Sequence, residues 1–157
     1  MTNTKNNQQR WLPHVSVAAI IERDKQFLLV EEIKQGKLML NQPAGHWENN
    51  ETLEEAVIRE TLEETAWHFK PTFLIGIYQW QHPIENNLTY LRFAFGGDLL
   101  EHDKFRTLDH DIENTIWLNE AEIRGSIERH RSPQLIKCVE DYLSGQRYPL
   151  ECIHLVK

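Results

Sequence analysis

Apolar residues occur early in the chain as short β-branched blocks separated by polar turns. The run VSVAAII at 15–21 is followed by ERDKQ and then by FLLV at 27–30, a pattern typical of two strands joined by a short turn. It predicts a hairpin with one buried face. A second turn signal, KQGK at 34–37, precedes LML, and NQPAG at 41–45 then breaks regular structure with its proline and glycine.

Three later segments have the composition of strands. They are TFLIGIYQW at 72–80, LTYLRFAFGGDLL at 88–100 and TIWL at 115–118, all rich in β-branched, aromatic and aliphatic residues. With the helices described next, the order of elements predicts an α/β or α+β sandwich.

Capping residues mark two helices in the last third of the chain. Asn119 is a suitable N-cap for a short helix that contains NEAEI. Ser132 and Pro133 have the chemistry of an N-cap and a first helical residue, and they predict a helix that runs to about Leu143, with Gly145 just past its end.

A glutamate-rich helix is predicted between the early and the late strands, within GHWENNETLEEAVIRETLEETAW at 45–67. Thr52 and Glu55 form a capping box at its start. At about 100° per residue, one face of the helix is apolar and should pack on the sheet. The residues of that face are Leu53, Ala56 and Val57.

The same face turns acidic further along, at Glu60, Glu63 and Glu64. Like charges three or four residues apart cost about 0.2–0.5 kcal/mol per pair, and partial burial increases the repulsion. A bound cation would relieve it, and oxygen ligands on a rigid helix suit Mg²⁺, with Mn²⁺ as the alternative. A solvated acidic helix face is the ordinary explanation of ExxEE and stays open on these residues alone.

Length and charge limit the classes of function. The 157 residues predict one domain at 11–157, preceded by a disordered Asn/Gln-rich tail at 1–10. The net charge of −7 argues against nucleic acid or an anionic membrane as the main partner. No apolar run approaches the roughly 20 residues of a membrane span, and the start lacks a secretory h-region. A cytoplasmic monomer or small homo-oligomer is expected, with a small-molecule partner.

A longer spacing surrounds the acidic cluster. Gly45 is followed after five residues by Glu51, and after seven more by Arg59 and the run ETLEE at 60–64. This arrangement resembles the Nudix box, G-x5-E-x7-R-E-U-x-E-E-x-G-U, in which U is aliphatic or bulky. The six defining positions of that box match with no insertion.

Three positions depart from the box. Thr61 replaces the usual aliphatic residue, Ala66 replaces the usual glycine, and Trp67 fills the last bulky position. Alanine in the left-handed conformation is disfavoured by roughly 1 kcal/mol. We therefore expect the helix to end differently or to continue about one residue further.

The resemblance implies a Nudix-like α/β/α sandwich with a mixed sheet and a loop-helix-loop motif. It implies that Glu60, Glu63 and Glu64 hold Mg²⁺ on a diphosphate, and that Glu63 or Glu64 orients the attacking water. The choice between these two stays open. The reaction implied is hydrolysis of a phosphoanhydride bond, with no covalent intermediate.

The other box residues are expected to shape the motif. Arg59 lies about 100° from the acidic cluster on a helical wheel, so it should pair with Glu51 and brace the loop. Gly45 should let the loop turn tightly against the helix start.

One branch of the family, the NudJ-type phosphatases, resembles the chain beyond the box. This branch implies release of orthophosphate from nucleoside tri- and diphosphates and from hydroxymethylpyrimidine diphosphate. The alternatives are a pyrophosphatase that cleaves a nucleotide sugar or dinucleotide, and a catalytically silent nucleotide-binding module. The matching stretches are PHVSVAAII at 13–21, NQPAGH at 41–46, QW at 79–80, LRF at 91–93 and SGQRYPLE at 144–151.

Four residues near loop or strand ends are candidates for substrate binding. Trp47 and Trp80 have rings that could stack on a base, and His82 could reach phosphate. Arg92, on an alternating strand, either faces the phosphates or faces solvent. Each aromatic residue has packing in the core or rim as its alternative.

Further candidates lie later in the chain. Glu113 occupies the place where many family members carry an extra carboxylate, so a water-activating or second-metal role is expected for it, with Asp111 as the competitor and an ordinary acid on the loop surface as the alternative. Arg147 and Tyr148 either close the pocket or pack the final segment. The cysteines, Cys138 and Cys152, show neither disulfide-framework nor zinc spacing.

Overall fold

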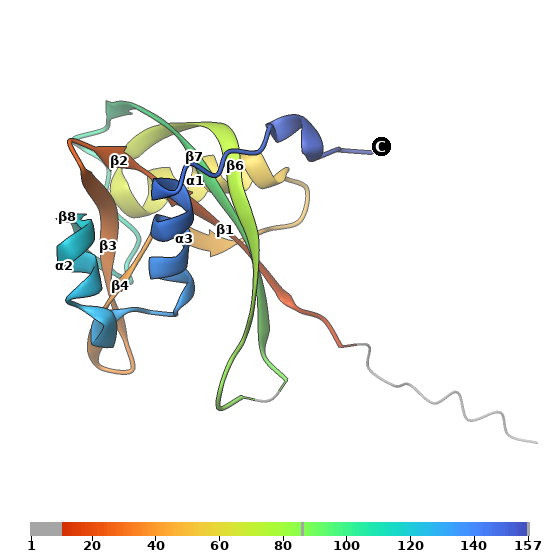
Figure 1. The fold of residues 1–157 in the computed structure, drawn as a ribbon. Coiled ribbons are helices and arrows are strands. Elements are labelled where there is room, and N and C mark those ends of the chain that lie inside the picture. Colours follow the sequence, from red (N-terminus) through yellow and green to blue (C-terminus); the bar gives the residue numbers. More distant parts are fainter. Residues whose placement is uncertain (1–10, 86, 157) are drawn as a thin grey trace, which may run out of the picture.

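The structure is a computed structural model that describes residues 11–85 and 87–156, and it contains two four-stranded sheets (Figure 1). The tail predicted at 1–10 lies outside the described residues. In the first sheet the strand order is β5-β1-β7-β6, with β1 parallel to β7 and the other pairs antiparallel, so the expected mixed sheet is confirmed. Its strands are β1 (His14–Ile20), β5 (Ala44–His46), β6 (Trp67–Gln81) and β7 (Thr89–His102).

The second sheet is antiparallel throughout, with β3 between β2 and β4 and with β8 also paired to β3. Its strands are β2 (Glu22–Arg23), β3 (Gln26–Lys34), β4 (Lys37–Asn41) and β8 (Ile112–Asn119). The helices are α1 (Leu53–Thr65), α2 (Glu120–Arg124) and α3 (Gln134–Leu143), with short 3-10 turns at Ile127–Arg129 and Leu150–Cys152. No helix in this described part of the chain is both long and apolar enough to cross a bilayer.

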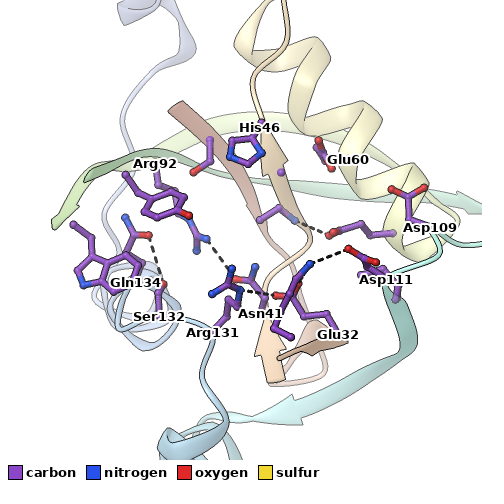
Figure 2. A pocket seen from close by; sticks show the side chains of 18 of the residues that line it. Glu32, Asn41, His46, Glu60, Arg92, Asp109, Asp111, Arg131, Ser132 and Gln134 are labelled. Atoms are coloured by element: carbon purple, nitrogen blue, oxygen red, sulfur yellow. Dashed lines mark hydrogen bonds and ion pairs between the residues drawn. The ribbon is translucent and has the colours of Figure 1, made fainter. Parts of the chain in front are cut away.

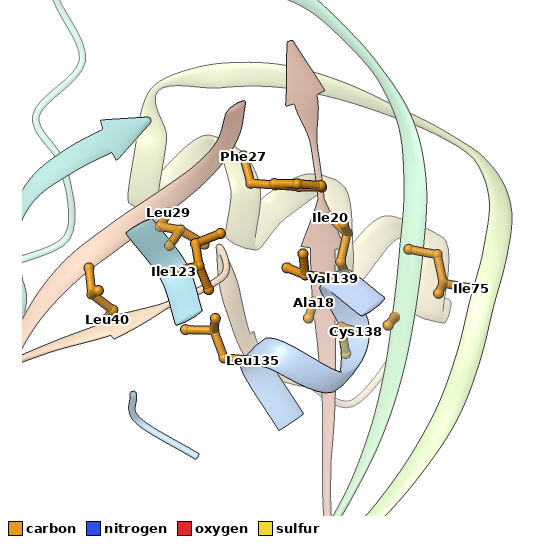
Figure 3. Packing of buried hydrophobic residues seen from close by; sticks show 11 residues of the cluster. Ala18, Ile20, Phe27, Leu29, Leu40, Ile75, Ile123, Leu135, Cys138 and Val139 are labelled. Carbon is orange, nitrogen blue, oxygen red and sulfur yellow. The ribbon is translucent and has the colours of Figure 1, made fainter. Parts of the chain in front are cut away.

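Strand β1 is buried on both of its faces, because helices cover the sheet from two sides. Val17 and Ala19 pack in one hydrophobic cluster, with Ala56 and Val57 of α1. The alternate residues of β1 pack in the other cluster, with α2 and α3. Figure 3 shows that second cluster, which includes Ala18, Ile20, Ile123, Leu135, Cys138 and Val139. The predicted α/β/α layering is confirmed.

The hairpin predicted from 15–21 and 27–30 is confirmed at its turn, where Leu28 N–H donates to Ile21 C=O at 3.0 Å, but it is wrong for the pairing of β1. β1 joins β5 and β7, whereas the hairpin partner of β3 is the two-residue strand β2. Asp24 and Lys25 both have positive φ, of 52° and 64°, as a tight two-residue hairpin turn requires. A continuous apolar run such as VSVAAII belongs to a strand covered on both faces, not to one with a single buried face.

Helix α1 begins as predicted, but the prediction for its end, that alanine would prevent a left-handed cap, is wrong. Thr52 Oγ1 accepts a hydrogen bond from Glu55 N–H, and the Glu55 side chain accepts one from Thr52 N–H, so the capping box is confirmed. Ala66 is the C-cap in the left-handed conformation, with φ 58°, where the expectation was that alanine would avoid it. The N–H of Ala66 still bonds to Leu62 C=O, and the buried site holds the residue despite the backbone strain.

The caps of the later helices are correct in part. Asn119 caps α2 in a capping box with Glu122, as expected for an N-cap. Helix α3 begins one residue later than predicted, with Pro133 at the N-cap and no side-chain cap bond, because the Ser132 hydroxyl contacts the Gln134 side chain instead. Gly145 follows the helix with φ 85°, as expected of a glycine past a helix end.

Candidate active site

A cavity of about 300 Å³ is lined by residues of both sheets, of α1 and of the loop that leads into β8 (Figure 2). Glu60 comes from α1 and Asp109 from the loop, on one side of the view. Gln134 and Ser132, at the start of α3, stand across the cavity from them. The acidic end and the α3 end are therefore separated by the length of the cavity.

Gly45 lies in β5, opposite Val17 of β1, and directly faces the carboxylate of Glu60. A Cβ built on Gly45 would lie 2.1 Å from Glu60 Cδ and Oε1 and 2.2 Å from Oε2. The glycine is thus needed for close approach of α1 to β5. The expected role, a tight turn of the loop, is wrong, because Gly45 is a strand residue without positive φ.

Arg59 pairs with Glu51 as predicted, but it does not point away from the acidic cluster. Arg59 Nη2 and Nε donate to the two carboxylate oxygens of Glu51 at 2.8 and 3.0 Å. Arg59 Nη1 donates to Glu60 at 2.7 Å and to Glu63 at 3.1 Å. One guanidinium therefore compensates three carboxylates. These bonds raise the pKa of Arg59, and the bond to Glu51 has the largest effect.

Glu64 turns its carboxylate toward β5, where Oε2 accepts a hydrogen bond from Ala44 N–H at 2.8 Å. Burial raises the pKa of Glu64 well above its ordinary value, and the charges of Glu60, Glu32 and Asp109 raise it further. Burial also raises the pKa of Glu60, against the lowering effect of Arg59. These carboxylates lie in an environment that disfavours their charge unless a cation compensates it.

The donor set fits a hard divalent cation. Glu60, Glu63 and Glu64 offer only carboxylate oxygens from one helix, and Glu60 and Glu64 line the cavity. As the side chains stand, no group of three His, Cys, Asp or Glu in the described residues is arranged as a metal-ligand cluster. The reason is visible in the contacts: Glu63 bonds to Arg59 and Glu64 bonds to a backbone N–H.

The loop into β8 brings Asp109 to the cavity in the place where Glu113 was expected. Asp109 N–H donates to Glu63 C=O at 3.0 Å, which ties the loop to the end of α1. Asp111 also lines the cavity, but it is paired with Lys34 at 2.9 Å. Glu113 is exposed on β8 and is not among the lining residues, because the strand begins at the buried Ile112 and turns Glu113 outward.

Two of the four proposed substrate-binding residues line the cavity. Trp80 is stacked on Tyr90 at 5.7 Å between ring centroids. Arg92 is buried, and its Nη1 donates to Gln42 Oε1 at 3.1 Å. Arg92 thus faces the cavity and not solvent.

The other two candidates make local structural bonds outside the cavity lining. Trp47 Nε1 donates to Glu51 C=O at 2.8 Å, within the loop before α1. His82 Nδ1 accepts hydrogen bonds from the N–H groups of Ile84 and Glu85 in the turn between β6 and β7. Both contacts shape loops.

The final segment packs against the fold and not over the cavity. The Arg147 guanidinium lies 4.2 Å from the ring centroids of both Phe73 and Tyr142. Tyr148 exchanges two backbone hydrogen bonds with Leu74 of β6. Of the two alternatives for SGQRYPLE, packing is therefore the one observed.

Several lining residues were not identified from the sequence. Glu32, on β3, carried no local signal, since it is one acid in an amphipathic stretch. Asn41 entered the sequence analysis only within NQPAGH, as part of a loop and of a stretch that resembles the NudJ-type branch. The missed residues include Ser16, Glu32, Asn41, Tyr90, Asp109, Arg131, Ser132 and Gln134.

Comparison with known proteins agrees with this geometry. The NUDIX domain family matches residues 12–137. The chain is 41% identical over 141 residues to proteins called Phosphatase NudJ from Escherichia coli strain K12 and from Shigella flexneri, covering 90% of this chain and 90% of each relative. Members of this family generally use a divalent metal ion.

Solved structures give the same result. A NUDIX hydrolase from Nitrosomonas europaea has a TM-score of 0.88 and 46% identity, covering 92% of this chain and 98% of that one. A UDP-X diphosphatase, with a TM-score of 0.72 and 21% identity over 92% of this chain and 70% of its own, shares the fold. The chain therefore belongs to the NUDIX domain family and is a Nudix hydrolase of phosphoanhydride bonds.

Proposed function

We propose that the enzyme is a Mg²⁺-dependent phosphatase that releases orthophosphate from nucleoside tri- and diphosphates and from hydroxymethylpyrimidine diphosphate. The observation that carries this proposal is the group of carboxylates on α1 at one end of the cavity. Helix α1 can approach β5 this closely because Gly45 has no side chain. The similarity to Phosphatase NudJ over nine tenths of both chains supports the phosphatase reaction.

The box carboxylates Glu60, Glu63 and Glu64 would hold the metal ion. A bound Mg²⁺ neutralises charge on phosphoryl oxygens and lowers the pKa of a coordinated water. Glu64 is the better placed of the two candidates for orienting the attacking water, because it lines the cavity whereas Glu63 is bonded to Arg59. Asp109 faces the same space and is a second candidate.

The remaining box residues position these carboxylates. Glu51 fixes the Arg59 guanidinium through two hydrogen bonds, and Arg59 in turn fixes Glu60 and Glu63. Such a network restricts side-chain rotation at the place where the phosphate chain would bind. Trp80 and Arg92 would contact substrate, and no substrate contact is assigned to Trp47, His82 or Glu113.

The test is orthophosphate release by the purified protein with Mg²⁺. The substrates are nucleoside triphosphates, nucleoside diphosphates, a nucleotide sugar and hydroxymethylpyrimidine diphosphate. Glu64→Gln should abolish release, and Glu54→Gln, in the first turn of the same helix, should retain it. Splitting of the nucleotide sugar without orthophosphate would favour a pyrophosphatase instead, and binding without hydrolysis would favour a nucleotide-binding module.

We further propose that the enzyme works in the cytoplasm on small molecules, as a monomer or small homo-oligomer, and not on nucleic acid. The net charge of −7 supports this restriction, since a polyanion would be repelled. Size-exclusion chromatography with light scattering measures the oligomeric state, and a gel-shift assay with RNA and DNA should show no complex.

A further inference from the structure

Three buried polar atoms of the described residues have no hydrogen-bond partner: Ser16 Oγ, Glu32 Oε1 and Arg92 Nε. The residues that carry them all line the one cavity described above. Buried polar atoms without partners are costly and rare, so each requires an explanation. We call these three residues the inner subsite, because a bound ligand would give every one of them a partner.

Two members of the inner subsite offer donors side by side. Ser16 of β1 and Arg92 of β7 are direct partners in the parallel register of the two strands. The other nitrogens of Arg92 are held, Nη1 by Gln42 Oε1 at 3.1 Å and Nη2 by Asn41 Oδ1 at 3.4 Å. The guanidinium is therefore fixed with its Nε–H free, next to a free hydroxyl, and this pair is suited to an acceptor atom.

The third member offers the opposite chemistry from the other sheet. Glu32 of β3 is buried and forms two ion pairs, from Oε2 to Lys34 Nζ at 3.4 Å and from Oε1 to Arg131 Nε at 3.6 Å, but the second is beyond hydrogen-bond distance and leaves Oε1 without a hydrogen bond. An ionised carboxylate only accepts hydrogen bonds, and it repels phosphate oxygens. The ligand group that meets Glu32 is therefore a hydrogen-bond donor or a cation, and not another phosphate. Figure 2 shows Asn41 between Arg92 and Glu32.

Aromatic side chains add a wall suited to a planar ring. Trp80 and Tyr90, on neighbouring strands of the same sheet, lie stacked with 23° between their rings and both line the cavity. Aromatic rings beside a few fixed polar atoms are the usual setting of a heterocycle. The acidic end remains available for the phosphate chain.

We propose that the inner subsite reads a heterocyclic base that carries an exocyclic amino group. The amino group donates to Glu32 Oε1, and an acceptor atom of the same base accepts from Arg92 Nε and Ser16 Oγ. Cytosine and other aminopyrimidines satisfy all three atoms, whereas uracil places a carbonyl oxygen against the carboxylate. This inference deepens the proposed function and rests on it for the position of the phosphate chain.

The first measurement compares CTP with UTP, which differ by one amino group and one carbonyl. Wild-type kcat/KM should favour CTP by about tenfold or more. Glu32→Gln should bring the two within about threefold, because the amide of glutamine donates to a carbonyl as well as accepting from an amino group. The matched control is Glu31→Gln, the neighbouring acid, which is paired with Arg129 and should keep the wild-type ratio.

A second measurement does not depend on hydrolysis or on metal. Binding of CMP and UMP is titrated in EDTA against the wild type, Glu32→Gln and Ser16→Ala, with melting temperature as the folding check. CMP should bind more tightly than UMP, and Ser16→Ala should weaken CMP binding about threefold to tenfold. Ser16→Ala provides a test should Glu32→Gln fail to fold.

The outcomes separate the two proposals. Equal kcat/KM values for CTP and UTP in an active wild type would overturn the inference without contradicting the proposed phosphatase activity. A general loss of kcat in Glu32→Gln, with the CMP and UMP affinities unchanged, also overturns it, because Glu32 would then act on the reaction. A CMP preference that depends on Glu32, in a protein that hydrolyses nothing, supports the inference and refutes the phosphatase.

Discussion

Replacing Gly45 by alanine tests whether the close approach of β5 to α1 determines activity. The added Cβ would lie 2.1 Å from both Cδ and Oε1 of Glu60, whereas carbon atoms in contact lie about 3.5–4.0 Å apart. Glu60 must therefore move by more than 1 Å, roughly the shortfall between these distances. Its carboxylate is held by Arg59 Nη1 at 2.7 Å, so the movement has to break this bond or push β5 away from the helix.

The substitution should have a small effect on stability and a large effect on catalytic rate. Overpacking a well-packed site costs about 1–3 kcal/mol of unfolding free energy, which lowers the melting temperature by about 2–4 °C per kcal/mol in a chain of this size. Displacing a catalytic group by about 1 Å costs on the order of 100-fold in rate. Gly45→Ala should thus stay folded while losing most of its activity and binding Mg²⁺ more weakly.

The assay combines orthophosphate release, Mg²⁺ titration and thermal unfolding on the same preparations. The control is Gly125→Ala at the end of α2, where the nearest atom to a new Cβ is Ala121 O at 3.3 Å and φ is −74°. It should retain wild-type activity and Mg²⁺ dependence. Wild-type activity and Mg²⁺ dependence in Gly45→Ala would refute the argument, since Glu60 would then have room to move without consequence.

Three other predictions concern the charge network, the helix end and the cysteines. Arg59→Ala should lower the unfolding free energy by about 2–4 kcal/mol in EDTA by leaving three carboxylates uncompensated, and saturating Mg²⁺ should reduce this deficit, as chemical denaturation would show. Ala66→Val should cost about 2 kcal/mol or more, because a β-branched residue cannot take the left-handed conformation without strain, while Ala66→Gly should stay within about 1 kcal/mol of wild type. Iodoacetamide at pH 8 should modify the exposed Cys152 alone in the native protein, since Cys138 is buried and burial raises its pKa to about 11; mass spectrometry showing two native adducts would contradict this.

The parts of the molecule that local sequence determines were predictable. The capping box of α1 and the apolar face that packs on the sheet depend on residues within one or two helical turns. The spacing from Gly45 to Glu64 likewise identified the acidic motif without any knowledge of strand pairing. The strain at Ala66 was visible in the sequence too, although its outcome depended on burial in the folded chain.

The remaining features depend on strand pairing, which local patterns do not determine. Ser16 and Arg92 become neighbours only because β1 and β7 are parallel across more than seventy residues of chain. Glu32 reaches the cavity because β3 is central in its own sheet. Position in sequence indicates Glu113, with Asp111 as its competitor, and gives no sign of Asp109, because the start of β8 at Ile112 decides which acids face the cavity.

The contacts of Arg59 connect the stability of the fold to its affinity for a divalent ion. Glu51 holds this guanidinium through two of its nitrogens, and the third nitrogen bonds to both Glu60 and Glu63. An ion that binds Glu60 through Oε1 or Glu63 through Oε2 therefore competes with Arg59 Nη1, while Arg59 stays anchored by Glu51. Removing the arginine should then have two opposite effects, a less stable apoprotein and a stronger intrinsic affinity of the carboxylates for the ion. Because binding to the folded state adds to stability in proportion to its affinity, Mg²⁺ should stabilise Arg59→Ala by more than it stabilises the wild type.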